Sequence, residues 1–501
     1  MIENPMVENP MVENPMVGNH LIDGNALEKY ILDYKNRDVD FKYRGMSLKF
    51  ALSNELFSSA GIDAGSIFLL KVFSDFLNNN KDHLIDILKN PERPLNLLDS
   101  GAGVGVLGIT AAKALLELSP GTESFHVHGQ DRDELSAIFS TYNARANRIP
   151  PALISFSTEP LLCGKNNYDI ILTNIPAKAG KPVLEDFVYR SAQMLKNKDG
   201  DVLPVGDSMP SRDVLPAGGM VFLVAVNTLA DDFRYWIEQY AELLYEESSN
   251  EHTVFVYTVS KEPKNRPKNY IKEKPIILDA DFPASYPFYF RNKADYEMEK
   301  IKYNLETVYG ASDFDSPGAE ISTAAKLSVK INLRDRLTSI GSRNDDNVIL
   351  IHDAGQGHFP LWLYKYLCTP SKIQVLLSGR NILSLSGARH NLRNYFNSIS
   401  ILPVMDIYHE REKIKLNFTE LTGEKWGNGF NFIAFLPSPH HNENTAWDGI
   451  NDLAAPGSLI LTCLPSSMAD RFNKKKKRGF SRIGEIKRAG YRAMAYSKGE
   501  I

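Results

Sequence analysis

The chain has 501 residues, of which 43% are hydrophobic and 24% are charged, and its formal net charge is −4. This composition is typical of folded globular proteins, and the length predicts two or three domains. A net charge so close to zero does not indicate a nucleic-acid binder, although the charge is unevenly distributed and the tail is locally basic.

The chain lacks a run of about 18 apolar residues, the length that a membrane-spanning helix needs, and its start lacks the layout of a secretory signal. Its three cysteines form no CxxC pair of the kind found in zinc and redox sites. His440 and His441 are adjacent, which is typical of a polar loop rather than a metal pair. We therefore expect a cytoplasmic protein with no membrane contact and no metal.

The first predicted element is a leader that does not fold. Residues 3–17 repeat Glu-Asn-Pro-Met-Val three times, and prolines at this spacing block helices while a period of five fits no sheet. We assign residues 1–45 to this disordered leader and an N-terminal extension.

Short apolar runs and segments of helical spacing alternate from residue 95 onward. Such alternation predicts an α/β domain with a mostly parallel sheet covered on both faces, whose ligands bind at the carboxyl ends of the strands. The predicted strands span residues 95–98, 125–127, 152–156, 168–172 and 220–226, and the predicted helices span 109–118, 134–147 and 184–195.

A second series of the same kind follows a segment rich in Lys, Pro and Asn at 261–274. An ungapped comparison of residues 127–145 with 375–393 pairs identical residues, which indicates an internal duplication. The pairs are Arg132 with Arg380, Ser136 with Ser384, Asn143 with Asn391 and Arg145 with Arg393. We expect domains at 46–262 and 301–501, with a linker at 263–300 and strands at 348–352, 373–377, 430–435 and 458–463.

A glycine-rich turn follows the first predicted strand of the first domain. Asp99 ends that strand, and Gly101, Gly103 and Gly105 allow a tight turn and close approach of a ligand to the backbone. Asp131 ends the next strand, where an acid can accept hydrogen bonds from both ribose hydroxyls. These features suit S-adenosylmethionine, but dinucleotide-binding domains share them.

The end of the fourth strand separates these two interpretations. Asn174 is followed by Ile175 and Pro176, and an amide beside a proline-stiffened turn can present carbonyl oxygens to an exocyclic amino group. A hydride-transferring enzyme needs no such group, so the pattern favours methyl transfer to an amine.

Residues 174–181, Asn-Ile-Pro-Ala-Lys-Ala-Gly-Lys, resemble the Asn-Pro-Pro-x-(Arg/His)-x-Gly-Lys motif of the RsmC-like methyltransferases, which modify guanine N2 in ribosomal RNA. Residues 56–66 resemble the segment that lies over the cofactor in that family, and the likeness extends over about residues 46–260. It implies two tandem Rossmann-like class I methyltransferase domains, with S-adenosylmethionine as cofactor and ribosomal or other structured RNA as substrate.

The resemblance also assigns roles to residues. Ile175 stands where the family motif has its first proline, and Ala177 stands where a bulky residue often contacts the planar target. The implied cofactor ligands are Asp63, Asp99, Gly101, Gly103, Gly105 and Asp131, the catalytic group is Asn174, Ile175 and Pro176, and the substrate contacts are Ala177, Lys178 and Lys181.

Other interpretations of these residues remain open. Asp63 is as well explained as a helix cap, and Asp133 is better explained as an acid at a helix start than as a ligand. The site would also serve a methyltransferase for a small molecule or a protein side chain. A binding protein without catalytic activity is the third alternative.

The second domain is expected to be degenerate and catalytically silent, and to serve in substrate placement or in covering the first domain. Residues 352–357, His-Asp-Ala-Gly-Gln-Gly, keep an acid and two glycines, but Gly379 aligns with Asp131 and Leu436 aligns with Asn174. The basic tail at 471–498 carries Phe472, Phe480, Tyr491 and Tyr496 among its lysines and arginines. It predicts an RNA-binding segment whose rings stack on bases, or alternatively a solvated edge strand.

Overall fold

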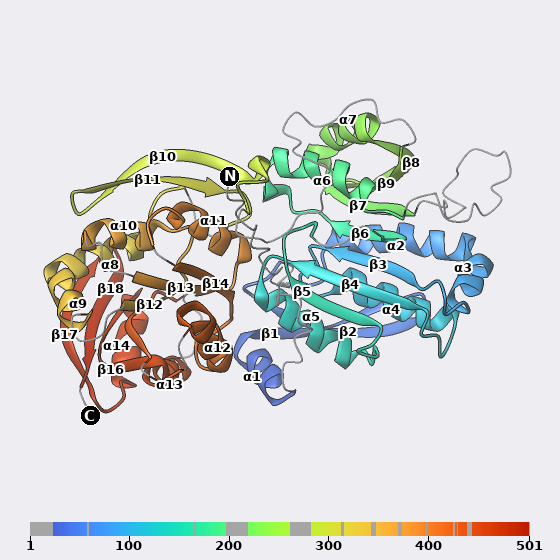
Figure 1. Ribbon diagram of the computed structural model, residues 1–501. Coiled ribbons are helices and arrows are strands. Elements are labelled where there is room, and N and C mark those ends of the chain that lie inside the picture. Colours follow the sequence, from blue (N-terminus) through green and yellow to red (C-terminus); the bar gives the residue numbers. More distant parts are fainter. Residues whose placement is uncertain are drawn as a thin grey trace, which may run out of the picture.

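The structure is a computed structural model in which two α/β domains lie side by side (Figure 1). It describes residues 24–57, 60–163, 167–196, 219–260, 282–311, 315–341, 347–368, 373–396, 398–423, 426–427, 429–437 and 443–499. The pentapeptide repeat, the segment 261–274 and the pair His440 and His441 lie outside these residues.

The first domain contains a seven-stranded sheet in the order β5-β4-β3-β6-β7-β9-β8. The first five strands in this order are parallel, and β9 is antiparallel to both β7 and β8. The strands are β3 Leu95–Ser100, β4 Phe125–Asp131, β5 Ile154–Thr158, β6 Ile170–Asn174, β7 Met220–Val226, β8 Ala241–Ser248 and β9 His252–Val259.

Helices cover both faces of this sheet, which explains why its central strands are continuously apolar. Leu97 packs into the core under α2 to α5, whereas Leu98 packs on the opposite face under α6 and α7. The helices are α2 Ala64–Asn79, α3 Lys81–Leu88, α4 Val106–Leu118, α5 Glu134–Ala146, α6 Lys181–Gln193 and α7 Ala230–Tyr240.

The second domain repeats this architecture, with the strand order β14-β13-β12-β15-β16-β18-β17. Its strands are β12 Asn347–His352, β13 Ile373–Gly379, β14 Ser398–Pro403, β15 Phe430–Phe435, β16 Ala454–Pro465, β17 Phe480–Arg488 and β18 Tyr491–Lys498. The helices α8 Ala319–Lys330, α9 Leu333–Gly341, α10 His358–Leu367 and α11 Ile382–Leu392 pack on one face, and α12 Arg411–Thr422, α13 Glu443–Leu453 and α14 Ser466–Lys474 pack on the other.

The predicted strands and helices of both domains are confirmed, with shifts at their ends. Two antiparallel hairpins were not predicted, and each precedes one of the sheets: β1 Lys35–Tyr43 with β2 Met46–Ser53, and β10 Phe290–Met298 with β11 Ile301–Val308. Strand β1 lies within the predicted extension and β10 begins within the predicted linker. The chain also forms α1 Gly24–Tyr34 and the short 3-10 helices η1 Ala177–Ala179, η2 Asn227–Leu229 and η3 Pro287–Tyr289.

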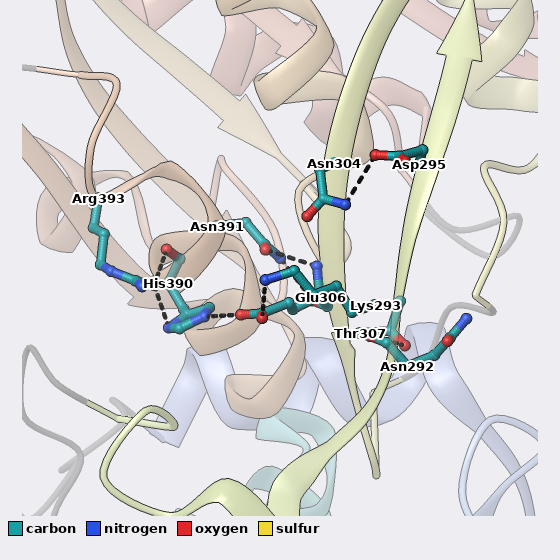
Figure 2. Close-up of polar contacts among 9 residues, drawn as sticks. All are labelled: Asn292, Lys293, Asp295, Asn304, Glu306, Thr307, His390, Asn391 and Arg393. Carbon is teal, nitrogen blue, oxygen red and sulfur yellow. Dashed lines mark hydrogen bonds and ion pairs between the residues drawn. The ribbon is translucent and has the colours of Figure 1, made fainter.

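Equivalent asparagines attach the two hairpins to their domains. The side chain of Asn143 on α5 bonds both backbone groups of Ala51 in β2. Asn391 on α11 does the same for Glu306 in β11, at 3.0 and 2.8 Å, and Figure 2 shows this contact beside the pair of His390 with Glu306. The residues that are identical between the halves therefore include a shared structural clamp.

The domains meet through equivalent segments. Asp133 and Asn381 form an antiparallel bridge, in which Glu134 N–H donates to Arg380 O and Ile382 N–H donates to Arg132 O. Apolar side chains of the second half also enter the cores of the first domain, among them Met405 and Leu383. The interface is therefore part of the packed structure, and it lies next to the strand end that carries Asp131.

Candidate active site

A cavity of about 480 Å³ lies at the carboxyl ends of β3, β4 and β6. Residues of the glycine-rich turn, Asp131 and the segment 174–179 line it, as do Leu56, Phe57, Asp63 and Ser66. The structure thus brings the separated sequence motifs of the first domain to one place, as expected for this type of sheet.

The glycine-rich turn has the backbone conformation that the sequence predicts. Gly101, Gly103 and Gly105 have φ values of 77°, 55° and 84°, a region that other residues adopt only with strain. Gly101 and Gly103 line the cavity, and a Cβ on Gly103 would point into open space. Gly105 instead lies against Ile109 and Ser140, where it permits close packing of α4 and α5.

Asp99 lies beneath this turn and does not line the cavity. It is 1% exposed, its Oδ2 accepts the Gly108 N–H at 2.7 Å, and its Oδ1 has no hydrogen-bond partner among the described residues. Burial raises the pKa of Asp99 to about 7 despite the bond from Gly108. In this structure its contact is with the start of α4, so its effect on a ligand would pass through the turn.

Asp131 lines the cavity at the end of β4. Its Oδ2 accepts the Gly103 N–H at 3.0 Å, and its Oδ1 accepts the Asp133 N–H at 3.1 Å. Burial raises the pKa of this carboxyl, while the neighbouring Arg132 lowers it. Asp133 itself caps α5 by accepting the Leu135 N–H, as an acid at a helix start does, but its carboxylate also pairs with Arg380 and lines the cavity.

The amide of Asn174 is held by two side chains from the start of α2. Its Nδ2 donates to Asp63 Oδ2 at 2.7 Å and to Ser66 Oγ at 3.0 Å. Because both bonds use the amide nitrogen, the carbonyl oxygen of Asn174 remains available as an acceptor. Asp63 also caps α2 through the Ser66 N–H, so the cap interpretation is confirmed and a contact with Asn174 is added to it.

The rest of the motif separates into residues at the cavity and one residue turned away. Ile175, Pro176, Ala177 and Lys178 line the cavity, with Ile175 buried and Lys178 exposed. Lys181 is absent from the lining and pairs with Asp232 at 2.6 Å. In this structure Lys181 is therefore not placed to contact a ligand.

The second half of the chain also lines this cavity, through residues that the sequence did not single out. Tyr289, Tyr309, Gly310 and Leu383 all line it, and His252 on β9 of the first domain lines it as well. No local motif marks the four residues of the second half, because they reach the site only through the contact between domains. The hydrophobic pattern of the second domain would have given the only signal, for Leu383.

The second domain keeps the turn but lacks counterparts of Asp99, Asp131 and Asn174. Asp99 pairs with Gly129 on the neighbouring strand, and the sequence comparison aligns Gly129 with Leu377. The strand partner of Leu377 is Ile351, so Ile351 rather than Asp353 occupies the place of Asp99. Asp353, Gly355 and Gly357 carry the positive φ values, so the expectation that the acid is retained was wrong: Asp353 replaces a glycine. A cavity of about 660 Å³ lies at this strand edge and includes Gly379 and Leu436.

Three of the four aromatic residues that the prediction named in the basic tail are core residues rather than stacking surfaces. Phe472, Phe480 and Tyr496 are at most 3% exposed and pack around Trp447 in the second domain. The tail consists of α14 and the edge hairpin β17–β18, so the prediction of exposed stacking rings was wrong for these three residues. Basic side chains such as Lys474 and Arg478 extend from this edge without an ion pair among the described residues.

The described residues contain no cluster of three or more His, Cys, Asp or Glu that could hold a metal. Within the same residues, no helix is long and apolar enough to cross a membrane.

Comparisons with known proteins show which family and fold the chain resembles. Residues 47–217 match the family model of the methyltransferase small domain. The uncharacterised protein YbxB of Bacillus subtilis is 28% identical over 173 residues, which cover 34% of this chain and 74% of YbxB. The 16S rRNA N2 guanosine methyltransferase RsmC of Thermus thermophilus, solved with AdoMet and guanosine, is 13% identical but covers 94% of this chain and 99% of its own, with a TM-score of 0.50. The chain therefore has the RsmC-like fold of two class I domains, and it is a methyltransferase of the S-adenosylmethionine-dependent class.

Proposed function

We propose that the first domain transfers the methyl group of S-adenosylmethionine to an exocyclic amine of structured RNA, with guanine N2 of ribosomal RNA as the leading acceptor. The observation that carries this proposal is the fixed amide of Asn174. Its nitrogen is bonded by Asp63 and Ser66, so its oxygen is the group available to an amine in the cavity.

The residues present suit the cofactor. Asp131 offers carboxylate oxygens to ribose hydroxyls, and the open space above Gly103 lets a ligand lie against the backbone. Asp63 and Asp131 supply negative charge near a cation. When bound there, the cofactor would supply an electrophilic methyl group.

The protein's own contribution is to position the acceptor. A methyl transfer to nitrogen is a displacement by a lone pair, so correct alignment of the amine lowers the barrier without a strong base. The Asn174 oxygen would accept one N–H of the amine and so direct its lone pair toward the methyl group. The backbone beside Asn174 is fixed at Ile175, whose side chain is buried and whose N–H donates a hydrogen bond of 3.2 Å to the Val224 carbonyl oxygen.

An RNA substrate is supported by the likeness to RsmC and by the basic edge at 474–478. We assign to the second domain a role in substrate placement, because it lines the cavity while Gly379 and Leu436 stand where the first domain has Asp131 and Asn174. RNA binding through phosphates should weaken steeply with salt, whereas binding of a small uncharged acceptor should not.

Single-turnover transfer of a labelled methyl group to unmodified ribosomal RNA tests the role of Asn174. We expect Asn174→Ala to lower the rate about 100-fold, because a misplaced amine loses much of the advantage of alignment. Cofactor affinity, measured by calorimetry, should change little. An unchanged transfer rate would refute the mechanism, and transfer to small molecules but not to RNA would refute the substrate class.

A further inference from the structure

Part of the wall of the cavity, next to the end of the Asn174 segment, comes from the second half of the chain. Tyr309 follows β11 directly, and Figure 1 shows the β10–β11 hairpin extending from the second domain toward the first. Tyr309 lines the cavity together with Ala177 and Ala179. An aromatic side chain is thus delivered to the site from outside the catalytic domain.

Tyr309 lies directly on the end of the catalytic motif. A Cβ on Gly180 would be 2.3 Å from Cδ1 and 2.4 Å from Cε1 of the Tyr309 ring, so any side chain at 180 would collide with it. Gly180 also has a φ of 91°, which disfavours other residues. The glycine of the motif therefore provides the space that the ring occupies.

The backbone around Tyr309 is fixed on both sides. The Tyr309 N–H donates to Tyr289 O at 2.7 Å, and the Val308 N–H before it donates to the Gln356 side chain at 2.6 Å. After it, Gly310 O accepts from the Asn381 side chain at 3.1 Å. A residue whose backbone is fixed in this way loses little backbone freedom when a ligand binds.

Tyr309 is also the best placed of the aromatic residues Phe57, Tyr289 and Tyr309 that line this cavity. Tyr289 is 2% exposed and its ring packs on Phe282 and Phe288, so little of its surface is available. Phe57 is 70% exposed, so little of the protein packs around its ring. Tyr309 is half-buried, so it combines a fixed position with accessible surface.

We propose that Tyr309 forms the surface on which the acceptor base stacks, and that it thereby restricts the substrate to planar nucleobases. This inference rests on the proposed function of the site. Ala177 leaves room beside the Asn174 amide. The ring of Tyr309, which comes from the other domain, provides the flat surface that contacts the base. Base stacking on an aromatic side chain is sequence-tolerant and favours any flat acceptor that carries an amine.

The test compares Tyr309→Leu, which keeps an apolar side chain, with Tyr309→Phe, which keeps the aromatic face. The assay measures kcat and KM for methyl transfer to unmodified ribosomal RNA. We expect Tyr309→Leu to raise KM about tenfold, because a stacking contact is lost. Tyr309→Phe should stay near the wild-type values, and cofactor affinity should be unchanged in both variants.

Tyr235→Leu is the matched control, since Tyr235 lies on α7, is 58% exposed and does not line the cavity. Wild-type KM in Tyr309→Leu, equal losses in the Leu and Phe variants, or a loss of cofactor binding would each overturn the proposed stacking. If the wild-type protein itself transfers no methyl group to RNA, the proposed function fails instead, and this outcome is seen before any variant is compared.

Discussion

Arg380 joins the second domain to two parts of the cofactor cavity, and its removal should weaken both stability and ligand binding. Its Nε and Nη2 donate to the two oxygens of Asp133 at 3.1 and 2.8 Å, and its Nη1 donates to Glu55. The Arg380 side chain is 15% exposed, and the carboxylates of Glu55 and Asp133 are 11% and 21% exposed. Arg380→Ala would remove the guanidinium group that contacts both shielded carboxylates.

Removing one partner of a buried ion pair typically costs about 3–5 kcal/mol. The remaining exposure of this cluster lowers the expected loss to about 2–4 kcal/mol in the free energy of unfolding. Glu55 and Asp133 also line the cavity, and the Asp133 N–H bonds Asp131, so the affinity for S-adenosylmethionine should fall as well.

Denaturant unfolding followed by tryptophan fluorescence measures the loss of stability, and calorimetry measures cofactor affinity. Because the interface couples the domains, we expect the variant to unfold in two separated transitions. Arg234→Ala is the control: its guanidinium pairs with Glu246 and Asp231 but is 39% exposed, so the cost should stay below about 1 kcal/mol. If Arg380→Ala unfolds like the control, our account of the interface is wrong.

Four further predictions follow from the site. Asp131→Ala should weaken S-adenosylmethionine binding about tenfold or more in calorimetry, since charge-assisted bonds to the ribose are lost. Asp63→Ala should lower the single-turnover rate more than cofactor affinity, because it frees the amide of Asn174; equal effects on both would contradict this order. The pKa of Asp99 is raised to about 7, so between about pH 4 and pH 7 the folded state keeps the Asp99 proton that the unfolded state loses. The free energy of unfolding therefore declines as pH rises through this window. Asp99→Asn should flatten that decline in unfolding measurements at several pH values. Replacing residues 474–478 by alanine should weaken RNA binding at all sequences and reduce its salt dependence. Filter binding at several salt concentrations measures both effects, and an unchanged slope would contradict this prediction.

The sequence predicted most of the sheet because its strands are short apolar runs ended by glycine, acid or asparagine. Strands such as Met220–Val226 and Phe430–Phe435 match the expected bounds, since burial on both faces makes them unambiguous. The hairpins β1–β2 and β10–β11 were missed because their exposed positions carry charged residues. Their attachment depends on Asn143 and Asn391, whose shared identity was visible but whose contact was not.

The candidate site was predictable only where local chemistry determines it. Asp131 and Asn174 lie at strand ends, so their convergence followed from the topology. The position of Lys181 depends on Asp232 in a distant helix, and Tyr309 depends on the packing of two domains. The burial of Phe472 and Tyr496 depends on a core around Trp447, which a charge pattern does not indicate.

In the second domain, Ile351 occupies the place that Asp99 has in the first. This difference affects which mutations could give the second domain a cofactor site. Asp99 accepts a hydrogen bond from the N–H of Gly108. The residue of the second domain that corresponds to Gly108 is Pro360, which has no N–H to donate. Ile351→Asp alone would therefore bury a carboxyl group without that donor. Likewise, a side chain at Gly379 would lie 2.9 Å from the Asp353 carboxylate. Each of these single substitutions would cost stability before it could contribute to a cofactor site, so point mutations do not easily produce such a site in the second domain.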